Sequence, residues 1–145
     1  MGKRCVMKTT KQILIMALVA MLWVSAAAAG EKAGQSAASG PSVVYQSKFP
    51  ITVQGADYDL LTIIMDFPSG AGFPRHFHGG PVLVTVLSGE MTLKKKGAEV
   101  VKKTGESWTE KPGDVHAVVN AGTAPVRVVV SMLLPKGAEA NTLVK

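Results

Sequence analysis

After residue 42 the chain is a succession of short runs of β-branched and aromatic residues, and each run ends at a turn signal. Turn segments that each contain Gly or Pro recur at 55, 68–70, 88–89, 97, 105, 112–114, 121–122 and 135. Several short strands separated by such turns are typical of an all-β sandwich or barrel. No window of eleven or more residues in this part of the chain follows a helical period. We predict strands over residues 43–46, 51–54, 57–67, 73–78, 81–88, 90–96, 100–104, 106–110, 115–120 and 126–134.

The strand expected at 57–67 is apolar on both of its faces, which predicts burial on both faces. The last eleven residues, 135–145, follow neither a strand nor a helix pattern clearly. We expect either a short helix or a frayed C-terminal tail there.

Residues 1–29 have the three-part layout of a secretory signal peptide. A basic head from Lys3 to Lys11 precedes twelve apolar residues at 13–24, and the small residues at 25–29 suit a cleavage site. A transmembrane anchor is the rival interpretation, but twelve residues fall short of the ~20 that a spanning helix needs. An uncleaved amphipathic tether lacks a polar face, and a lipid anchor is disfavoured because Cys5 precedes the apolar run. We therefore expect a cleaved signal and a periplasmic or secreted protein, with no membrane contact after cleavage.

Loss of this leader changes the charge balance of the chain. The full chain has 16 basic and 10 acidic residues, a formal charge of +6, and four of the basic residues lie in the leader, which has no acid. The 12 basic and 10 acidic residues that remain leave about +2, so nucleic acid is not an expected partner. The one cysteine is also lost, which excludes a disulfide, a thiolate ligand and a thiol nucleophile.

The remaining residues fit a single domain with one core. Residues 30–42 are rich in Gly, Ala and Ser and predict a flexible linker. We expect the barrel domain over 43–134, followed by the tail at 135–145.

The chain has three histidines, His76, His78 and His116. Side chains at i and i+2 of an extended strand share a face, so His76 and His78 should lie side by side. His116 begins a later strand, after the turn at 112–114. Three imidazoles from two strands suit one divalent ion and leave coordination positions open. We predict a metal site, with Fe, Mn, Ni or Zn as the candidate ions.

The spacing of these histidines resembles the two motifs of the cupin superfamily. The first motif matches Gly70-x5-His76-x-His78-x3-Val82-x6-Gly89, and the second matches Gly105-x5-Lys111-x-Gly113-x2-His116-x3-Asn120. The resemblance implies a double-stranded β-helix, the cupin or jelly-roll barrel, in which inward-pointing side chains hold the metal. Cupins often pair through barrel edges, so a homodimer is a candidate assembly, and the sequence leaves the oligomeric state open.

Two positions depart from the family pattern. Val82 stands where cupins usually have a glutamate ligand, and Lys111 stands where the second motif usually has proline. Without that carboxylate the metal centre is more positive by one unit, which favours an anionic, chelating ligand. Glu110 is a candidate substitute, but charged residues beside turns are normally exposed and we expect it at the surface. Val82 should face the interior beside the histidines, carried back along the same wall by a hairpin that starts at Pro81.

Some cupin dioxygenases that act on thiols, β-diketones or aromatic acids use three histidines alone. The resemblance therefore implies, as the leading hypothesis, a metal-dependent dioxygenase acting on a small anionic substrate. A non-catalytic binding module for a metal, sugar or small anion is the alternative, and a structural domain with an empty barrel is a third class. The sequence assigns no acid–base residue.

Other residues have more ordinary expected roles. Arg75 should point away from the metal, and Arg127 should form a salt bridge on the outer face. Asn120 should make turn hydrogen bonds, and Asp114 should serve the turn rather than orient His116. The candidate walls of a ligand pocket are Tyr58, Met65, Phe67, Phe73, Phe77 and Trp108.

Overall fold

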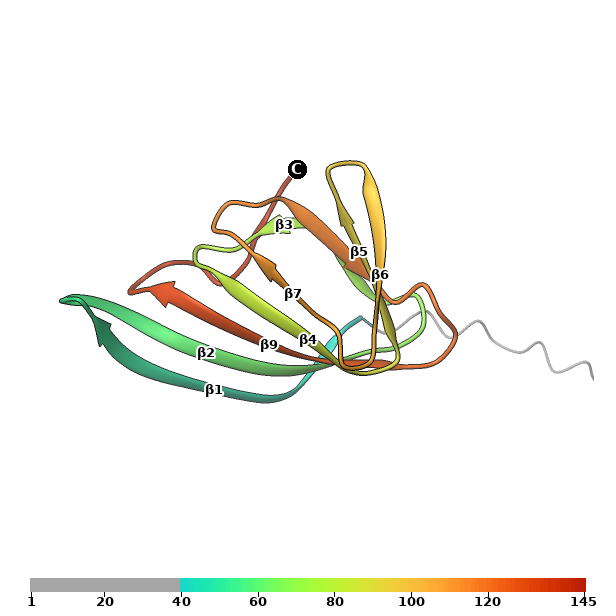
Figure 1. Ribbon diagram of the computed structural model, residues 1–145, viewed down its shortest axis with the longest axis horizontal. Coiled ribbons are helices and arrows are strands. Elements are labelled where there is room, and N and C mark those ends of the chain that lie inside the picture. Colours follow the sequence, from blue (N-terminus) through green and yellow to red (C-terminus); the bar gives the residue numbers. More distant parts are fainter. Residues whose placement is uncertain (1–39) are drawn as a thin grey trace, which may run out of the picture. The chain divides into compact units, whose positions relative to one another are not determined.

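The computed structural model describes residues 40–145. The expected signal peptide and residues 30–39 of the expected linker lie outside the described residues. The described part is all-β, as predicted, with ten strands in two antiparallel five-stranded sheets. The two sheets face each other across the core (Figure 1). In residues 40–145 no helix is long and apolar enough to cross a membrane.

The first sheet has the strand order β1-β2-β9-β4-β7. Its strands are β1 (Ser42–Val53), β2 (Ala56–Phe67), β9 (Val126–Pro135), β4 (Val82–Ser88) and β7 (Ser107–Glu110). The second sheet has the order β10-β3-β8-β5-β6. Its strands are β10 (Thr142–Leu143), β3 (Gly72–Phe77), β8 (His116–Val119), β5 (Glu90–Lys95) and β6 (Ala98–Lys103). Strands that follow one another in the chain therefore often belong to opposite sheets.

The core follows from the alternation of side chains along the long strands of the first sheet. In β2, β4 and β9 every second residue is buried, and these residues are mainly Val, Ile, Leu, Met and Phe. Met91 of β5 meets them from the second sheet, with Phe73, Leu93 and Val118 packed against the cluster. The outward side chains of β2 are half-buried or exposed. The prediction that this strand is buried on both faces is therefore wrong.

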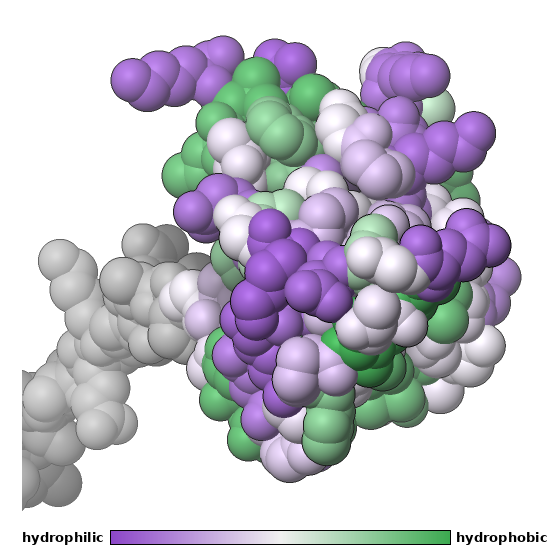
Figure 2. Space-filling model, turned by 90° about the vertical axis from the view of Figure 1, so that its left-hand side faces the viewer, coloured by the Kyte–Doolittle hydropathy of each residue, from purple (hydrophilic) through white to green (hydrophobic). Residues whose placement is uncertain are grey.

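β1 is one strand of twelve residues, whereas the sequence predicted two short ones separated at 47–50. It lies at the edge of the first sheet, where Pro50 costs no inter-strand hydrogen bond on the open side. Tyr45 and Phe49 of β1 are more than half exposed. Hydrophobic side chains thus reach the surface between hydrophilic ones (Figure 2).

The C-terminal segment is neither a helix nor a frayed end. β10 pairs with β3, with Leu143 opposite His76. The amide of Gly79 donates to the carbonyl of Glu139, and the amide of Val144 donates to the carbonyl of Arg75. The tail is therefore held along β3 by backbone hydrogen bonds, which leave little trace in the side-chain pattern.

Candidate metal centre

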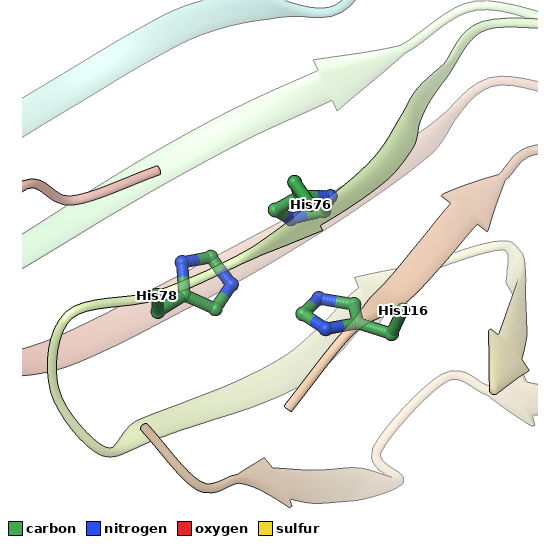
Figure 3. Close-up of side chains that lie close together, drawn as sticks. All are labelled: His76, His78 and His116. Atoms are coloured by element: carbon green, nitrogen blue, oxygen red, sulfur yellow. The ribbon is translucent and has the colours of Figure 1, made fainter. Parts of the chain in front are cut away.

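The three histidines meet inside the barrel (Figure 3). His76 in β3 lies directly opposite His116 in β8, and a β-bulge between Phe73 and His76 sets this register. His78 follows the last residue of β3 and projects to the same face as His76. The ring centroids are 4.3 Å apart for His76 and His116, 4.9 Å for His76 and His78, and 5.1 Å for His78 and His116. The predicted convergence is therefore present, and one candidate ligand atom of each residue lies within 4.8 Å of the others.

Burial and hydrogen bonding fix the orientation and the tautomer of the three imidazole rings. The three residues are only 2 to 4% exposed. Each Nδ1 lies 2.7 to 2.9 Å from a backbone carbonyl oxygen, that of Pro74 for His76, Ala140 for His78 and Asp114 for His116. A carbonyl oxygen only accepts, so each Nδ1 carries the proton. In the neutral imidazoles the lone pairs are then on the three Nε2 atoms, which is the tautomer that metal-binding histidines use when Nδ1 is held by a carbonyl.

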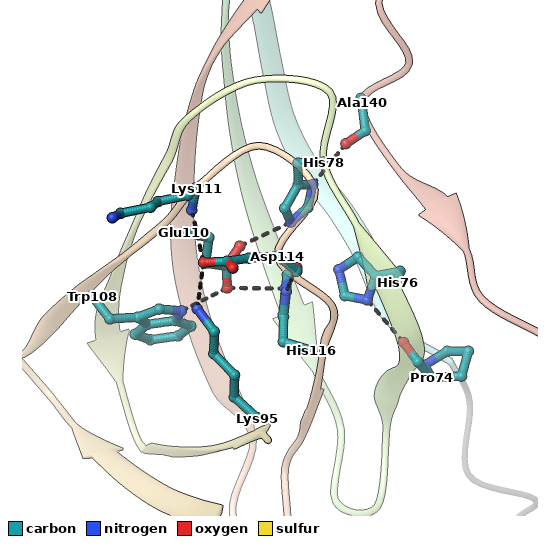
Figure 4. Close-up of polar contacts among 10 residues, drawn as sticks. All are labelled: Pro74, His76, His78, Lys95, Trp108, Glu110, Lys111, Asp114, His116 and Ala140. Atoms are coloured by element: carbon teal, nitrogen blue, oxygen red, sulfur yellow. Dashed lines mark hydrogen bonds and ion pairs between the residues drawn. The ribbon is translucent and has the colours of Figure 1, made fainter. Parts of the chain in front are cut away.

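A carboxylate completes this cluster, and it comes from the residue expected at the surface. Glu110, the last residue of β7, is 3% exposed, so that expectation is wrong. Its Oε2 lies 2.9 Å from Nε2 of His78, and its Oε1 lies 3.0 Å from Nε2 of His116 (Figure 4). The indole Nε1 of Trp108 donates to Oε1 at 2.8 Å. Trp108 and Glu110 are two apart in one strand, so the expectation that Trp108 faces the pocket already implied an inward Glu110.

The cluster is electrostatically coupled. Burial alone would raise the pKa of Glu110, but the contacts with His116, His78 and Trp108 outweigh it and hold the pKa below its ordinary value. Burial lowers the pKa of His116, and the Glu110 carboxylate more than reverses this, so the pKa of His116 lies above its ordinary value. Burial lowers the pKa of His76. The centre is therefore built around one buried negative charge.

The donor set fits a divalent ion. An Nε2 lone pair and a carboxylate oxygen repel each other at 3 Å unless a cation lies between them, either a proton or a metal. Glu110 Oε2 is buried and makes no hydrogen bond of acceptable geometry to the described residues. Three imidazole nitrogens and a carboxylate oxygen are ligands that zinc, iron, manganese and nickel accept. The roles of His76, His78 and His116 as metal ligands remain a prediction.

Val82 faces the interior as predicted, but by a different route. It is 3% exposed and lies opposite Glu110 in the pairing of β4 with β7. β3 and β4 belong to opposite sheets, so the expected hairpin from Pro81 is absent and the chain crosses the barrel there. Gly80 permits this crossing, because a Cβ atom at that position would lie 2.0 Å from the carbonyl oxygen of Leu133.

The roles expected for Arg75, Arg127 and Asn120 agree with the structure, whereas Asp114 also orients His116. Arg75 is exposed, and Arg127 forms a bidentate pair with Asp66 through contacts of 2.6 and 2.7 Å. Asn120 is fully buried; it bonds the backbone of Gly122 and Ala124 in the turn, as expected, and also donates to the carbonyl of Phe67 at the end of β2. Asp114 holds His116 through its backbone carbonyl, while its carboxylate pairs with a lysine.

A cavity of about 350 Å³ opens beside the histidines. Four of the six predicted wall residues line it, namely Met65, Phe67, Phe73 and Trp108, whereas Tyr58 and Phe77 do not. Among the described residues that line it, Glu110 carries the one full negative charge and there is no lysine or arginine. The remaining walls are largely aliphatic. Any attraction for an anion must therefore come from a bound metal or from a protonated histidine of the cluster.

The family model described as Cupin domain matches residues 63–132. No curated protein matches this chain.

Solved structures share the fold at low sequence identity. An uncharacterized conserved protein with a double-stranded β-helix domain from Klebsiella pneumoniae is 24% identical, with a TM-score of 0.52 over 74% of this chain and 91% of its own. The polyketide cyclase RemF from Streptomyces resistomycificus is 21% identical, with a TM-score of 0.53 over 73% and 75%. Oxalate oxidase in complex with the substrate analogue glycolate is 19% identical, with a TM-score of 0.52 over 68% and 55%.

Proposed function

The chain belongs to the cupin superfamily, and from this premise we propose that it binds one divalent metal ion through His76, His78 and His116 and acts there on a small molecule. The observation that carries the proposal is that one candidate ligand atom of each of the three buried rings lies within 4.8 Å of the others. Three backbone carbonyls hold the rings in the tautomer that a metal requires. Buried histidines that bind no metal are not expected to share one tautomer and to place their free nitrogens close together.

The cavity indicates the kind of small molecule. Its volume of about 350 Å³ lies at the small end of ligand sites. Its walls offer apolar contact and no cationic side chain, so the ligand should have a compact apolar body and a metal-binding head. Oxalate oxidase, whose structure holds glycolate, illustrates that this fold can accept a small carboxylate. We propose a small chelating anion as the ligand.

A metal-dependent dioxygenase is the reaction class that we propose. A bound transition metal would supply a Lewis-acidic, redox-active centre with open positions facing the cavity. The protein's own residues orient the three imidazoles, bury the centre and exclude bulk water. The alternative is a non-catalytic binding module, which the shortage of acid–base residues around the cavity favours: apart from the cluster itself, none of the described lining residues titrates near neutral pH.

Oxygen uptake separates these functions. The metal-free protein would be loaded in turn with Fe(II), Mn(II), Ni(II) and Zn(II) and tested with small carboxylates, β-diketones and thiols. Oxygen consumption that needs both metal and substrate, and that His116→Ala abolishes, supports the dioxygenase. Thermal stabilisation by a ligand without oxygen uptake supports the binding module. If no compound causes oxygen uptake or thermal stabilisation, the result contradicts a small-molecule function.

We also propose that the protein is exported. The support is the basic, apolar and small-residue order of residues 1–29. Exported material should begin between Ala27 and Glu31 on N-terminal sequencing. Exported material that retains residues 13–24 would contradict the proposal.

A further inference from the structure

We propose that Glu110 is a fourth protein ligand of the metal, so that the carboxylate of this centre comes from β7. The inference rests on the proposed metal function and extends it to a residue that lies at an unspecified position of the second motif. It starts from two contacts: the carboxylate oxygens of Glu110 lie 2.9 and 3.0 Å from the Nε2 atoms of His78 and His116. These are the atoms that the Nδ1–carbonyl bonds leave free to bind a cation.

A purely structural role explains this carboxylate poorly. Burying a carboxylate is unfavourable unless it is paired and fully hydrogen-bonded. Glu110 receives one neutral hydrogen bond, from Trp108, and no lysine or arginine is among the described residues that line the cavity. Its Oε2 makes no hydrogen bond of good geometry with the described residues. A glutamine of the same shape would fill the space without the charge, so the charge calls for a cation: in the metal-free protein a proton shared with His116 or His78, and in the loaded protein the metal itself.

The strand register explains how β7 comes to supply the ligand. Val82 on β4 and Glu110 on β7 are directly opposite each other in an antiparallel pair. Directly opposite side chains share a face, with Cβ atoms roughly 5 Å apart. A glutamate at either position therefore points into the same part of the barrel.

A carboxylate ligand changes which ions the centre should prefer. Carboxylate oxygen is a hard donor that suits Mn(II), whereas three imidazoles alone suit zinc, copper and nickel. It also cancels one positive charge of the metal. The argument that this centre is unusually positive, which the sequence suggested from Val82, then no longer applies.

The test compares metal affinity among charge-matched variants by calorimetry, with Mn(II) and Zn(II) as the probes. Glu110→Gln keeps the shape and removes the charge, and it should weaken Mn(II) binding by at least about 10- to 100-fold, with a smaller loss for Zn(II). The swap Val82→Glu with Glu110→Val returns the carboxylate from the opposite strand and should recover most of the Mn(II) affinity. Glu99→Gln, at an exposed residue of β6 that pairs with Lys94, is the control and should bind as the wild type does.

The outcomes separate this inference from the function on which it rests. Wild-type protein that takes up no divalent ion refutes the metal function itself. Wild-type protein that binds, with Glu110→Gln binding equally well, overturns the ligand role even if the metal-free variant melts at a different temperature. If Glu110→Gln does not fold, the swap decides: affinity near that of the wild type supports the ligand role, and its loss overturns it.

Discussion

Replacing His116 and His76 separately by alanine should have the same effect on metal binding and different effects on the metal-free fold. Both variants lose one of three imidazoles and should lose most metal affinity. In the metal-free protein, however, His116 contacts the Glu110 carboxylate at 3.0 Å, whereas the Nδ1 of His76 bonds the carbonyl of Pro74 and its ring lies 5.7 Å from that of Phe73. His116→Ala therefore leaves a buried charge short of its partner, and His76→Ala does not.

The size of this difference follows from the contacts that remain. Breaking a buried ion pair from one side costs about 3–5 kcal/mol, and the low end applies because Trp108 and His78 still contact the carboxylate. His76→Ala should cost about 1 kcal/mol for its hydrogen bond, and the space left by either ring opens to the same cavity. The difference of about 2 kcal/mol corresponds to about 8 °C in melting temperature for a domain of this size.

Urea unfolding of the chelator-treated proteins measures this difference. Fluorescence reports on the site directly, because Trp108 is the one tryptophan outside the expected leader. Combining His116→Ala with Glu110→Gln should recover most of the lost stability, since the unpaired charge is removed. Equal destabilisation by His116→Ala and His76→Ala, or no recovery in the double variant, would refute the reasoning about the buried carboxylate.

Three further outcomes test other parts of the structure. Asn120→Ala removes three hydrogen bonds, one buried and two partly buried, and should lower the free energy of unfolding by about 2–4 kcal/mol in urea titration, without changing metal stoichiometry. Deleting the chain from Ala140 onward removes the carbonyl that orients His78 and should weaken metal binding about 10- to 100-fold by calorimetry; unchanged affinity would exclude that role. The hydrogen bond from Arg127 lowers the pKa of Asp66, so this pair stabilises the fold above the ordinary aspartate pKa and the effect is lost in acid. Melting curves from pH 6 to pH 3 should therefore show a smaller drop for Asp66→Asn than for the wild type.

The period of two along a strand predicted the all-β class and the shared face of His76 and His78. The likeness to the two cupin motifs predicted that His116 joins them inside a double-stranded β-helix. Sheet membership was not predictable in the same way. The short segment between β3 and β4 looks like a hairpin turn, yet Gly80 lets it cross from one sheet to the other against β9. The alternation of apolar and polar residues shows which side chains of a strand point to the core. It does not show which strands pair with that strand.

The prediction that Glu110 lies at the surface was wrong because it followed the general preference of glutamate for solvent. It gave less weight to the alternation of side chains along β7. Trp108 was already expected to face the pocket, and the residue two positions on must share that face. The C-terminal segment is a different case. It is held by backbone hydrogen bonds to β3, and its carbonyl at Ala140 reaches His78. Backbone contacts of this kind depend on tertiary position and do not show in the order of side chains.

Metal content tests the central claim most directly. The mature protein would be purified without a histidine tag or chelator, and its metals would be quantified together with those of His116→Ala. We expect about one equivalent of a divalent transition metal per chain in the wild type and a loss of most of it in the variant. Wild-type protein that carries no metal, and takes none up when Fe(II), Mn(II), Ni(II) or Zn(II) is supplied, would contradict the account.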